Sequence, residues 1–447
     1  MKKILVQGGT IVNEGAIFRG DLLIEGEFIA AVAPGEIGAI PPGTEIIAAA
    51  GKYVIPGVID DQVHFREPGL THKEEIAGGS RAAAAGGITS FMDMPNVVPP
   101  TTTRARLLEK HEIARRSSLV NYSFYLGAST DNMDEVRRAD PRVTCGVKLF
   151  MGSSTGDLLV ERVDLLERLF AASPLLVAAH CEDNAIIRDN LARYRALYGE
   201  AIPPACHPLI RDRAACFASS SLAARLARAC PSARLHILHL STREELALLD
   251  GGPRAERRIT GEACVHHLWF NDSAYLTLGN RVKWNPAIKT EEDRLALLRA
   301  VNDGVIDVVA TDHAPHLPGE KEGTYARAAS GGPMVQHALV VMLELVERGE
   351  ISLAAVVERM CHAPADIFRV ERRGYLRPGY KADVVLFERH PWRVTRESLL
   401  YKCGWSPVEG LPLSHRVVTT LVNGQAVYQD GQFTGARPGE ALGFHVR

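Results

Sequence analysis

Residues 58–64 read VIDDQVH, a run of β-prone apolar residues that ends in a histidine. Short apolar runs of this kind are typical of strands buried in a parallel sheet. Seven more segments resemble it: ITSFMDM (88–94), VNYSFYL (120–126), CGVKLFM (145–151), PLLVAAH (174–180), RLHILHL (234–240), ITGEACVHHL (259–268) and VIDVVATDH (305–313). We therefore predict eight parallel strands.

The stretches between these segments carry apolar residues at helical spacing. Examples are VERVDLLERLF (160–170), ASSSLAARLARA (218–229) and EEDRLALLRAV (291–301). Strands that alternate with helices indicate the α/β class, and eight such repeats predict a closed (β/α)8 barrel of the TIM type. We assign residues 55–370 to this barrel.

The two ends of the chain have a different pattern. Residues 1–54 and 371–447 contain short β-prone segments, such as ADVVLF and RVVTTLV, separated by turns such as NEG, PPG and VNGQ. Regularly spaced strands and turns of this kind indicate all-β structure. Each end is too short to form two packed sheets alone, so we predict that both ends pair into one small β-sandwich.

The composition favours a globular protein that acts on a small molecule. Apolar residues make up 46% of the 447 residues, charged residues 23%, and the formal net charge is -2. The chain has no long run of like charge, which argues against a nucleic-acid or membrane partner. It also has no signal-peptide pattern, no apolar stretch long enough to span a bilayer and no paired cysteine spacing, so we expect a cytoplasmic location.

Five residues with useful chemistry fall near the ends of different predicted strands: His64, Lys148, His180, His239 and Asp312. In a (β/α)8 barrel the carboxyl ends of the strands converge on the active site. Imidazole and carboxylate groups suit zinc and, less selectively, manganese, cobalt or iron. One such histidine alone is more often a core residue, but the shared placement favours a metal site that activates water for hydrolysis.

Several motifs make the chain similar to a known family. IDDQVHFREPG, FMDMPN, GVKLFMGSSTG, AHCED, HILHLS and ATDHAPH resemble the amidohydrolase superfamily, and the dihydroorotases in particular. The resemblance covers nearly the whole chain. It implies the barrel, the composite sandwich and the reversible closure of N-carbamoyl-L-aspartate to L-dihydroorotate and water.

The resemblance also implies roles for individual residues. Lys148 would carry a carbamate that bridges two metal ions, and Asp312 would bind metal and act as general acid/base. Arg66 would grip the carboxylate of the substrate, since a guanidinium can bind a carboxylate through two hydrogen bonds. The other substrate-binding positions that the resemblance implies are Asn96, Asn285, His316, Gly332 and Pro333.

One position departs from the family pattern, in which the first strand presents two histidines. This chain has Gln62 in place of the first histidine, two residues before His64. A glutamine oxygen is a poorer donor than imidazole to a zinc-like ion. Three outcomes stay open: Gln62 is a substitute ligand, a single metal site is well occupied, or catalysis is lost.

Two other functions compete with a dihydroorotase. One is a related cyclic amidohydrolase of the dihydropyrimidinase, hydantoinase or allantoinase kind, and the other is a non-catalytic partner of aspartate carbamoyltransferase. Arg66 favours a substrate with a carboxylate, and retention of the other metal-binding positions favours an enzyme. A homodimer is common in the family, and association with aspartate carbamoyltransferase also stays open.

Overall fold

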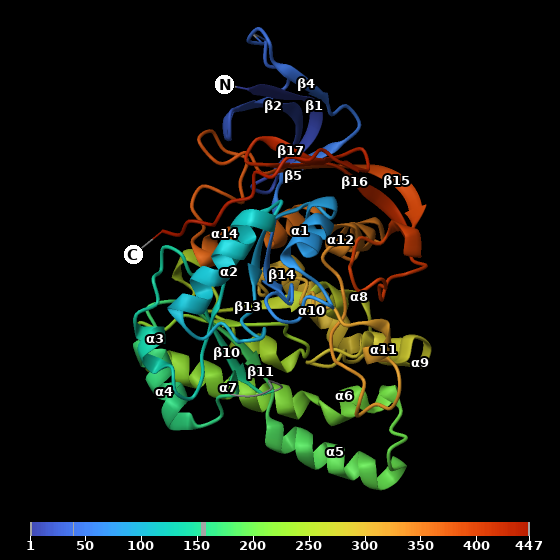
Figure 1. Ribbon diagram of the computed structural model, residues 1–447. Helices are drawn as coiled ribbons and strands as arrows, with labels where there is room; N and C mark the ends of the chain where they lie inside the picture. Colours follow the sequence, from blue (N-terminus) through green and yellow to red (C-terminus); the bar gives the residue numbers. More distant parts are fainter. Residues whose placement is uncertain (1, 39, 153–157, 446–447) are drawn as a thin grey trace.

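The computed structural model describes residues 2–38, 40–152 and 158–445 (Figure 1). Its central feature is a ring of parallel strands: β6 (Val58–Val63), β7 (Ile88–Asp93), β8 (Asn121–Phe124), β9 (Leu126–Gly127), β10 (Val147–Met151), β11 (Val177–Cys181), β12 (Leu235–Ile237), β13 (Ile259–Cys264) and β14 (Val308–Ala310). The ring closes where Val63 pairs in parallel with His313. Because β8 and β9 both fall on the third predicted segment (120–126), the ring has eight strand positions, and the predicted barrel is confirmed.

Helices surround the ring: α1 (Ile76–Ala85), α2 (Arg104–Ser117), α3 (Met133–Arg137), α4 (Val163–Ala172), α5 (Asn184–Tyr198), α6 (His207–Ile210), α7 (Arg213–Ala229), α8 (Val265–Trp269), α9 (Ala274–Leu278), α10 (Glu291–Asp303), α11 (Pro318–Lys321), α12 (Ala338–Glu347), α13 (Leu353–Val357) and α14 (Ala363–Phe368). Several of them begin at a polar residue whose side chain accepts a hydrogen bond from the first turn, as Thr103, Asp183, Asp212 and Thr290 do. Such caps satisfy backbone donors that have no partner within the helix.

Both ends of the chain contribute to a second sheet. Its nine strands are β1 (Lys3–Asn13), β2 (Ala16–Glu25), β3 (Phe28–Pro34), β4 (Glu45–Ala48), β5 (Tyr53–Pro56), β15 (Val384–Arg393), β16 (Pro412–Val422), β17 (Gln425–Gln429) and β18 (Gln432–Phe433). β5 is parallel to β1 and antiparallel to β15, so it joins the two halves. Figure 1 shows the blue and red strands together at one end of the molecule.

A buried polar network connects this sheet to the barrel. Asp383 pairs with Arg373, and it accepts hydrogen bonds from the side chain of Asn121 in β8 (3.1 Å) and the backbone amide of Asn423 (2.8 Å). Asp383 and Arg373 are each only a few per cent exposed. The division into residues 55–370 and a composite terminal unit stays a prediction, and this network lies where the two parts would meet.

The structure differs from the predicted elements in one informative place. The seventh strand ends at Cys264, and His266 and His267 lie in α8. A continuous apolar run does not distinguish a buried strand from a buried helix, which is why the sequence pattern extended the strand too far. Within the described residues, no helix combines the length and the apolar character needed to cross a membrane.

Candidate active site

A cavity of about 210 Å³ opens at the carboxyl ends of the barrel strands. Ten of the twelve residues that the sequence singles out line it: Gln62, His64, Arg66, Asn96, Lys148, His180, His239, Asn285, Asp312 and His316. The other two, Gly332 and Pro333, are not among its lining residues. The barrel therefore brings together side chains that are distant in the sequence, such as Gln62 and Asp312, which are 250 residues apart.

One side of the cavity is built around Asp312, two residues beyond β14. Its Oδ1 lies 3.1 Å from Nε2 of His64 and 3.2 Å from Nε2 of Gln62. Nδ1 of His64 lies 2.7 Å from Oδ1 of Asn96 and donates to it, which leaves the lone pair of Nε2 directed at Asp312 and the cavity. Asn96, predicted to bind substrate, thus also orients a candidate metal ligand.

The amide of Gln62 is turned away from metal coordination in this arrangement. Its nitrogen faces Asp312, while its oxygen accepts a hydrogen bond from Sγ of Cys264 at 3.7 Å. The amide must therefore rotate before its oxygen can act as a ligand beside Asp312.

The opposite side of the cavity holds a pair of histidines. Nδ1 of His180 and Nε2 of His239 lie 2.9 Å apart. Nε2 of His180 lies 2.9 Å from Glu182, which also forms a two-pronged ion pair with Arg211. Burial lowers the pKa of both histidines, so both rings are neutral and their facing nitrogens suit a cation.

Lys148 lies between these two groups. It is the second residue of β10, and because Phe150 pairs with His180, Lys148 lies deeper in the barrel than the predicted strand end. Burial lowers the pKa of its amine to about 8. Among the described residues it forms no ion pair, and its Nζ lies 4.5 Å from the centre of the Phe150 ring. Its neutral fraction at neutral pH is therefore larger than that of an exposed lysine, and carbon dioxide reacts with the neutral amine.

Arg66 forms the wall near the mouth and is 6% exposed. Its Nε donates to the carbonyl oxygen of Pro315 (3.2 Å), and its Nη2 lies 3.2 Å from His316. Within the described part of the chain, no carboxylate forms an ion pair with it. A buried guanidinium without a carboxylate partner favours binding of an anionic ligand.

Asn285 and His316 complete the polar lining. Oδ1 of Asn285 is buried and has no hydrogen-bond partner among the described residues, so it is available to a donor on a ligand. Nδ1 of His316 accepts from Lys73 (3.1 Å), and its Nε2 donates to the carbonyl oxygen of Ser330 (3.0 Å). Burial, with the charges of Arg66 and Lys73, lowers the pKa of His316, which keeps the ring neutral.

Three residues of the site have unusual backbone conformations. The φ angles of Arg66, His239 and Asp312 are 64°, 39° and 44°. Residues other than glycine rarely adopt positive φ, and such conformations cluster at functional sites because the surrounding structure must hold them.

Sequence reasoning missed several lining residues: Phe150, Trp284, Ala314, Ser330 and Gly331. The sequence could have predicted Phe150, because it follows Lys148 by two residues and so faces the same side of the strand. Glu182, in the AHCED motif, had a similar signal beside His180. Trp284 had none, since it lies outside any predicted strand.

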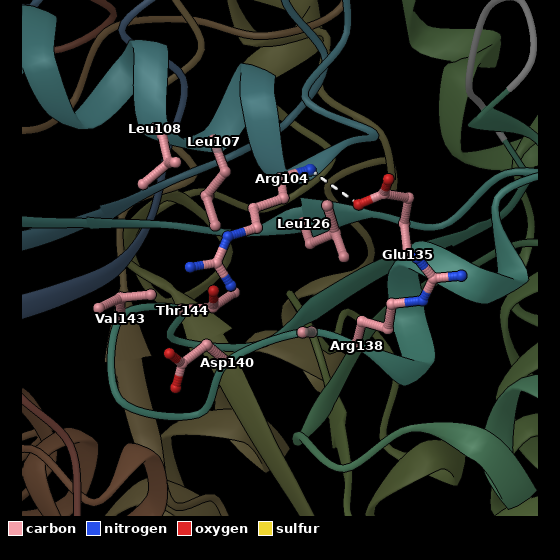
Figure 2. Close-up of a pocket in the computed structure, with 10 residues that line it drawn as sticks. Arg104, Leu107, Leu108, Leu126, Glu135, Arg138, Asp140, Val143 and Thr144 are labelled. Atoms are coloured by element: carbon pink, nitrogen blue, oxygen red, sulfur yellow. Dashed lines mark hydrogen bonds between the residues drawn. The ribbon is translucent and has the colours of Figure 1, made fainter.

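A second cavity lies away from the barrel mouth, between α2 and the segment that follows α3 (Figure 2). Leu107, Leu108 and Leu126 contribute apolar side chains, and the backbone amide of Arg104 donates to Glu135 at 2.9 Å. It contains none of the candidate catalytic residues, so the barrel mouth is the better candidate for chemistry.

The comparisons with known sequences agree with this geometry. Residues 53–427 match the Amidohydrolase family. A dihydroorotase from Anaplasma phagocytophilum is 33% identical over 93% of this chain and 92% of its own length. A dihydroorotase from Halobacterium salinarum is 35% identical, covering 94% and 95%. An allantoinase from Bacillus velezensis is 32% identical, covering 96% and 94%.

Solved structures show the same architecture. L-hydantoinase (dihydropyrimidinase) from Arthrobacter aurescens superimposes with a TM-score of 0.93 at 25% identity, covering 99% of this chain and all of the other. Dihydropyrimidinase from Brevibacillus agri gives 0.86 at 24% identity over 98% of each chain, which supports the fold alone.

Proposed function

Because this chain belongs to the amidohydrolase family and is a metal-dependent cyclic amidohydrolase, we propose that it is a dihydroorotase. It would interconvert N-carbamoyl-L-aspartate and L-dihydroorotate in the biosynthesis of pyrimidines. The observation that supports this substrate is Arg66, a buried guanidinium in the cavity wall with no carboxylate partner among the described residues. Both molecules of the proposed reaction carry a carboxylate that can pair with it.

The donor set in the cavity fits one or two divalent ions. His64 and Asp312 would hold one ion, and His180 and His239 the other. Lys148 would bridge them after its neutral amine attacks carbon dioxide and loses a proton, forming an N–C bond and an anionic carbamate. When bound, zinc, or manganese, cobalt or iron in its place, supplies an activated water.

The chain's own residues would then guide the ring through the reaction. Arg66 binds the carboxylate, and the unpartnered oxygen of Asn285 accepts an N–H of the ring. Asp312 takes the proton from the attacking water and delivers it to the ring nitrogen as the amide bond breaks. Ring closure follows the same steps in reverse, so Asp312 acts as base in one direction and as acid in the other.

His316 and the backbone at Gly332 and Pro333 would complete the substrate site. The carbonyl oxygen of Gly332 accepts from the backbone amide of Ala314 (3.0 Å), which ties this segment to the cavity wall. An added Cβ at Gly332 would lie 2.6 Å from Trp284, so glycine is needed for this close approach.

A side-by-side assay tests the substrate. We expect ring opening of dihydroorotate to exceed that of dihydrouracil, hydantoin and allantoin. Replacement of Arg66 by Met should raise KM for dihydroorotate by about 10-fold or more, because a charge-assisted pair is lost, with little change for uncharged rings. Lys402→Met is the matched control, since it removes a cation that already pairs with Glu75 and does not line the cavity.

The second candidate is a cyclic amidohydrolase for uncharged rings. The similar allantoinase and the similar hydantoinase structure favour it. Faster turnover of allantoin or hydantoin than of dihydroorotate, unchanged by Arg66→Met, would support this candidate and exclude a dihydroorotase.

The assembly state and location also belong to the proposal. We propose a cytoplasmic homodimer, and association with aspartate carbamoyltransferase is a second proposal that is compatible with it. Light scattering of the purified protein, with and without that enzyme, tests both. Metal-free, inactive protein in a stable complex would indicate a scaffolding role instead.

A further inference from the structure

A second group of metal-binding side chains lies inside the barrel, below the cavity. Asp61 of β6, His236 of β12 and Glu262 of β13 meet there, and each is 0% exposed. None of them lines the cavity at the mouth. The proposed reaction uses none of them, so their convergence needs another explanation.

Four polar atoms of this triad are buried without a hydrogen-bond partner among the described residues. They are both carboxylate oxygens of Asp61, Nε2 of His236 and Oε2 of Glu262. Buried polar groups are nearly always satisfied, and each exception requires an explanation such as an ion. Here the unpartnered atoms belong to three different strands and point at one another, since each residue's ligand atom lies within 4.8 Å of the others.

The separations suit coordination better than hydrogen bonding. Nε2 of His236 lies 3.4 Å from Oδ2 of Asp61 and 3.5 Å from Oε2 of Glu262. Hydrogen bonds between N–H and oxygen span about 2.7–3.2 Å. Two ligands of a tetrahedral ion, each about 2.0–2.2 Å from it, lie roughly 3.4 Å apart.

Hydrogen bonds elsewhere hold the triad in a ligand-like state. Oγ1 of Thr260 donates to the carbonyl oxygen of Leu235 (3.4 Å), so it accepts from Nδ1 of His236 at 2.8 Å. A histidine that donates through Nδ1 presents its other nitrogen for a metal, as metal-ligating histidines usually do. Oε1 of Glu262 accepts from the backbone amide of His239 (3.0 Å), which leaves Oε2 directed at His236.

The surroundings make it energetically unfavourable for Asp61 and Glu262 both to be ionised without a cation beside them. The ring of Phe368 packs edge-on against His236 at 5.6 Å, and Tyr125 donates to the backbone oxygen of Asp61 rather than to its carboxylate. Two negative charges in an apolar interior require a compensating cation or protons. A divalent ion would balance both charges and satisfy all four unpartnered atoms.

We propose that Asp61, His236 and Glu262 bind a divalent transition-metal ion of the zinc class, separate from the ions at the mouth. It is a structural ion, because its ligands are completely buried and leave no access for substrate. The inference does not rest on dihydroorotase activity. Through Glu262 the ion would fix the backbone of His239, and so the floor of the cavity.

Metal content after chelation tests the proposal. Purified full-length protein is loaded with zinc, dialysed against a strong chelator and analysed by mass spectrometry. Mouth ions are accessible and should be removed, whereas about one ion per chain should remain, because its release requires unfolding. In Asp61→Asn that resistant ion should be lost.

Asp60→Asn is the matched control. Asp60 is the neighbouring buried carboxylate, but its oxygens already accept from Thr311 and Gln62. It should keep the resistant ion. If Asp61→Asn keeps the ion as well, the proposal is wrong.

A crystal structure of the unaltered protein tests the proposal without requiring that any variant folds. Anomalous scattering at the zinc edge should give a peak between the three side chains. Peaks at the mouth alone, with His236 drawn to hydrogen-bond distance of Asp61 or Glu262, would overturn the proposal and indicate a protonated imidazole instead. Activity measured in parallel distinguishes failure of the interior-ion proposal from failure of the proposed dihydroorotase function. Loss of the interior ion should leave the choice of substrate unaffected.

Discussion

At the scale of single residues, Asp312 combines two close side-chain contacts with an unusual backbone conformation. It accepts from Gln62, faces His64 and has a φ of 44°. In Asp312→Asn we expect kcat for dihydroorotate to fall about 10²–10⁴-fold, because the proton acceptor is lost. Circular dichroism should be unchanged, since asparagine keeps the shape of the side chain. Retained turnover would contradict the assigned role.

Substitution of Gln62 tests whether position 62 contributes to metal binding in the cavity at the barrel mouth. Gln62→His would place an imidazole beside His64 and Asp312, and imidazole is a better ligand than a neutral amide for zinc-like ions. We expect tighter zinc binding, measured by competition with a chromogenic chelator. Gln62→Leu is the control, and equal affinity in all three proteins would mean that position 62 does not contact the ion.

The sequence predicted which side chains gather at the cavity better than it predicted their contacts. His64, His180, His239 and Asp312 could be found because each lies near the end of a recognisable strand or just beyond it. The contact of Asn96 with His64 could not, because it depends on how two loops pack. The interior triad was also invisible, since Asp61, His236 and Glu262 meet only when the barrel closes.

At the scale of elements, the turn between β16 and β17 tests how the two chain ends meet. Gly424 has a φ of 72°, and an added Cβ would lie 2.0 Å from the backbone oxygen of Gly26 in the N-terminal half. We expect Gly424→Ala to lower the free energy of unfolding by about 1–3 kcal/mol through this overlap and the strained φ. Chemical denaturation measures the change.

Gly431, in the turn between β17 and β18, provides the matched control. Its φ is 83°, but an added Cβ would meet nothing within 4 Å. Gly431→Ala should therefore cost only the conformational strain, about 1 kcal/mol. Equal losses in the two variants would show that the contact with Gly26 does not matter.

His111 of α2 makes the barrel sensitive to acid. Its ring packs edge-on against Phe124 (4.9 Å), and burial lowers its pKa to about 4. Unfolded histidine has a pKa of about 6.5, so between these values only the unfolded chain takes the proton. The stability that this group supports is complete above about pH 6.5 and falls by up to about 3 kcal/mol as the pH drops to about 4.

We expect His111→Gln to reduce the difference in Tm between about pH 7.5 and about pH 4.5, because the variant has no ring to protonate. Differential scanning calorimetry measures it. His390→Gln, which removes an exposed histidine of β15, is the control. An unchanged difference in Tm for His111→Gln would place the acid sensitivity elsewhere.

The elements themselves were largely predictable. The predicted segments 58–64, 88–94 and 145–151 correspond to β6, β7 and β10 within a few residues. The end of β13 was not predictable, because the apolar run continues directly into α8. Tertiary packing rather than local pattern decides where such a run changes conformation.

At the scale of the whole molecule, Asp383 joins the terminal sheet to the barrel. It accepts from Asn121 of the barrel and balances the charge of Arg373, which is 3% exposed. Asp383→Ala would leave that guanidinium with Glu440 as its remaining carboxylate partner, and it would remove the buried acceptor of Asn121 and of the backbone amide of Asn423. We expect a loss of about 3–5 kcal/mol in the free energy of unfolding, measured by denaturant titration.

Glu388→Ala is the control, since it breaks a surface pair with Arg416. Its effect should stay within about 1 kcal/mol. A comparable effect of both substitutions would mean that the buried network contributes little to holding the two parts together.

The sequence predicted the architecture as a whole because repeats and turns are local signals. It predicted that the two ends combine, since neither is large enough alone, but not that β5 would lie between β1 and β15. Strand neighbours are set by long-range pairing, which no local pattern encodes.

The position of β5 between β1 and β15 has a consequence for protein synthesis. Translation releases β5 early and β15 only after the barrel strands have left the ribosome. Until then the nascent chain carries an open hydrogen-bonding edge, which invites aggregation. A premature stop codon between the barrel and β15 (Val384–Arg393) would make that exposure permanent, so we expect such truncated products to be insoluble and rapidly degraded.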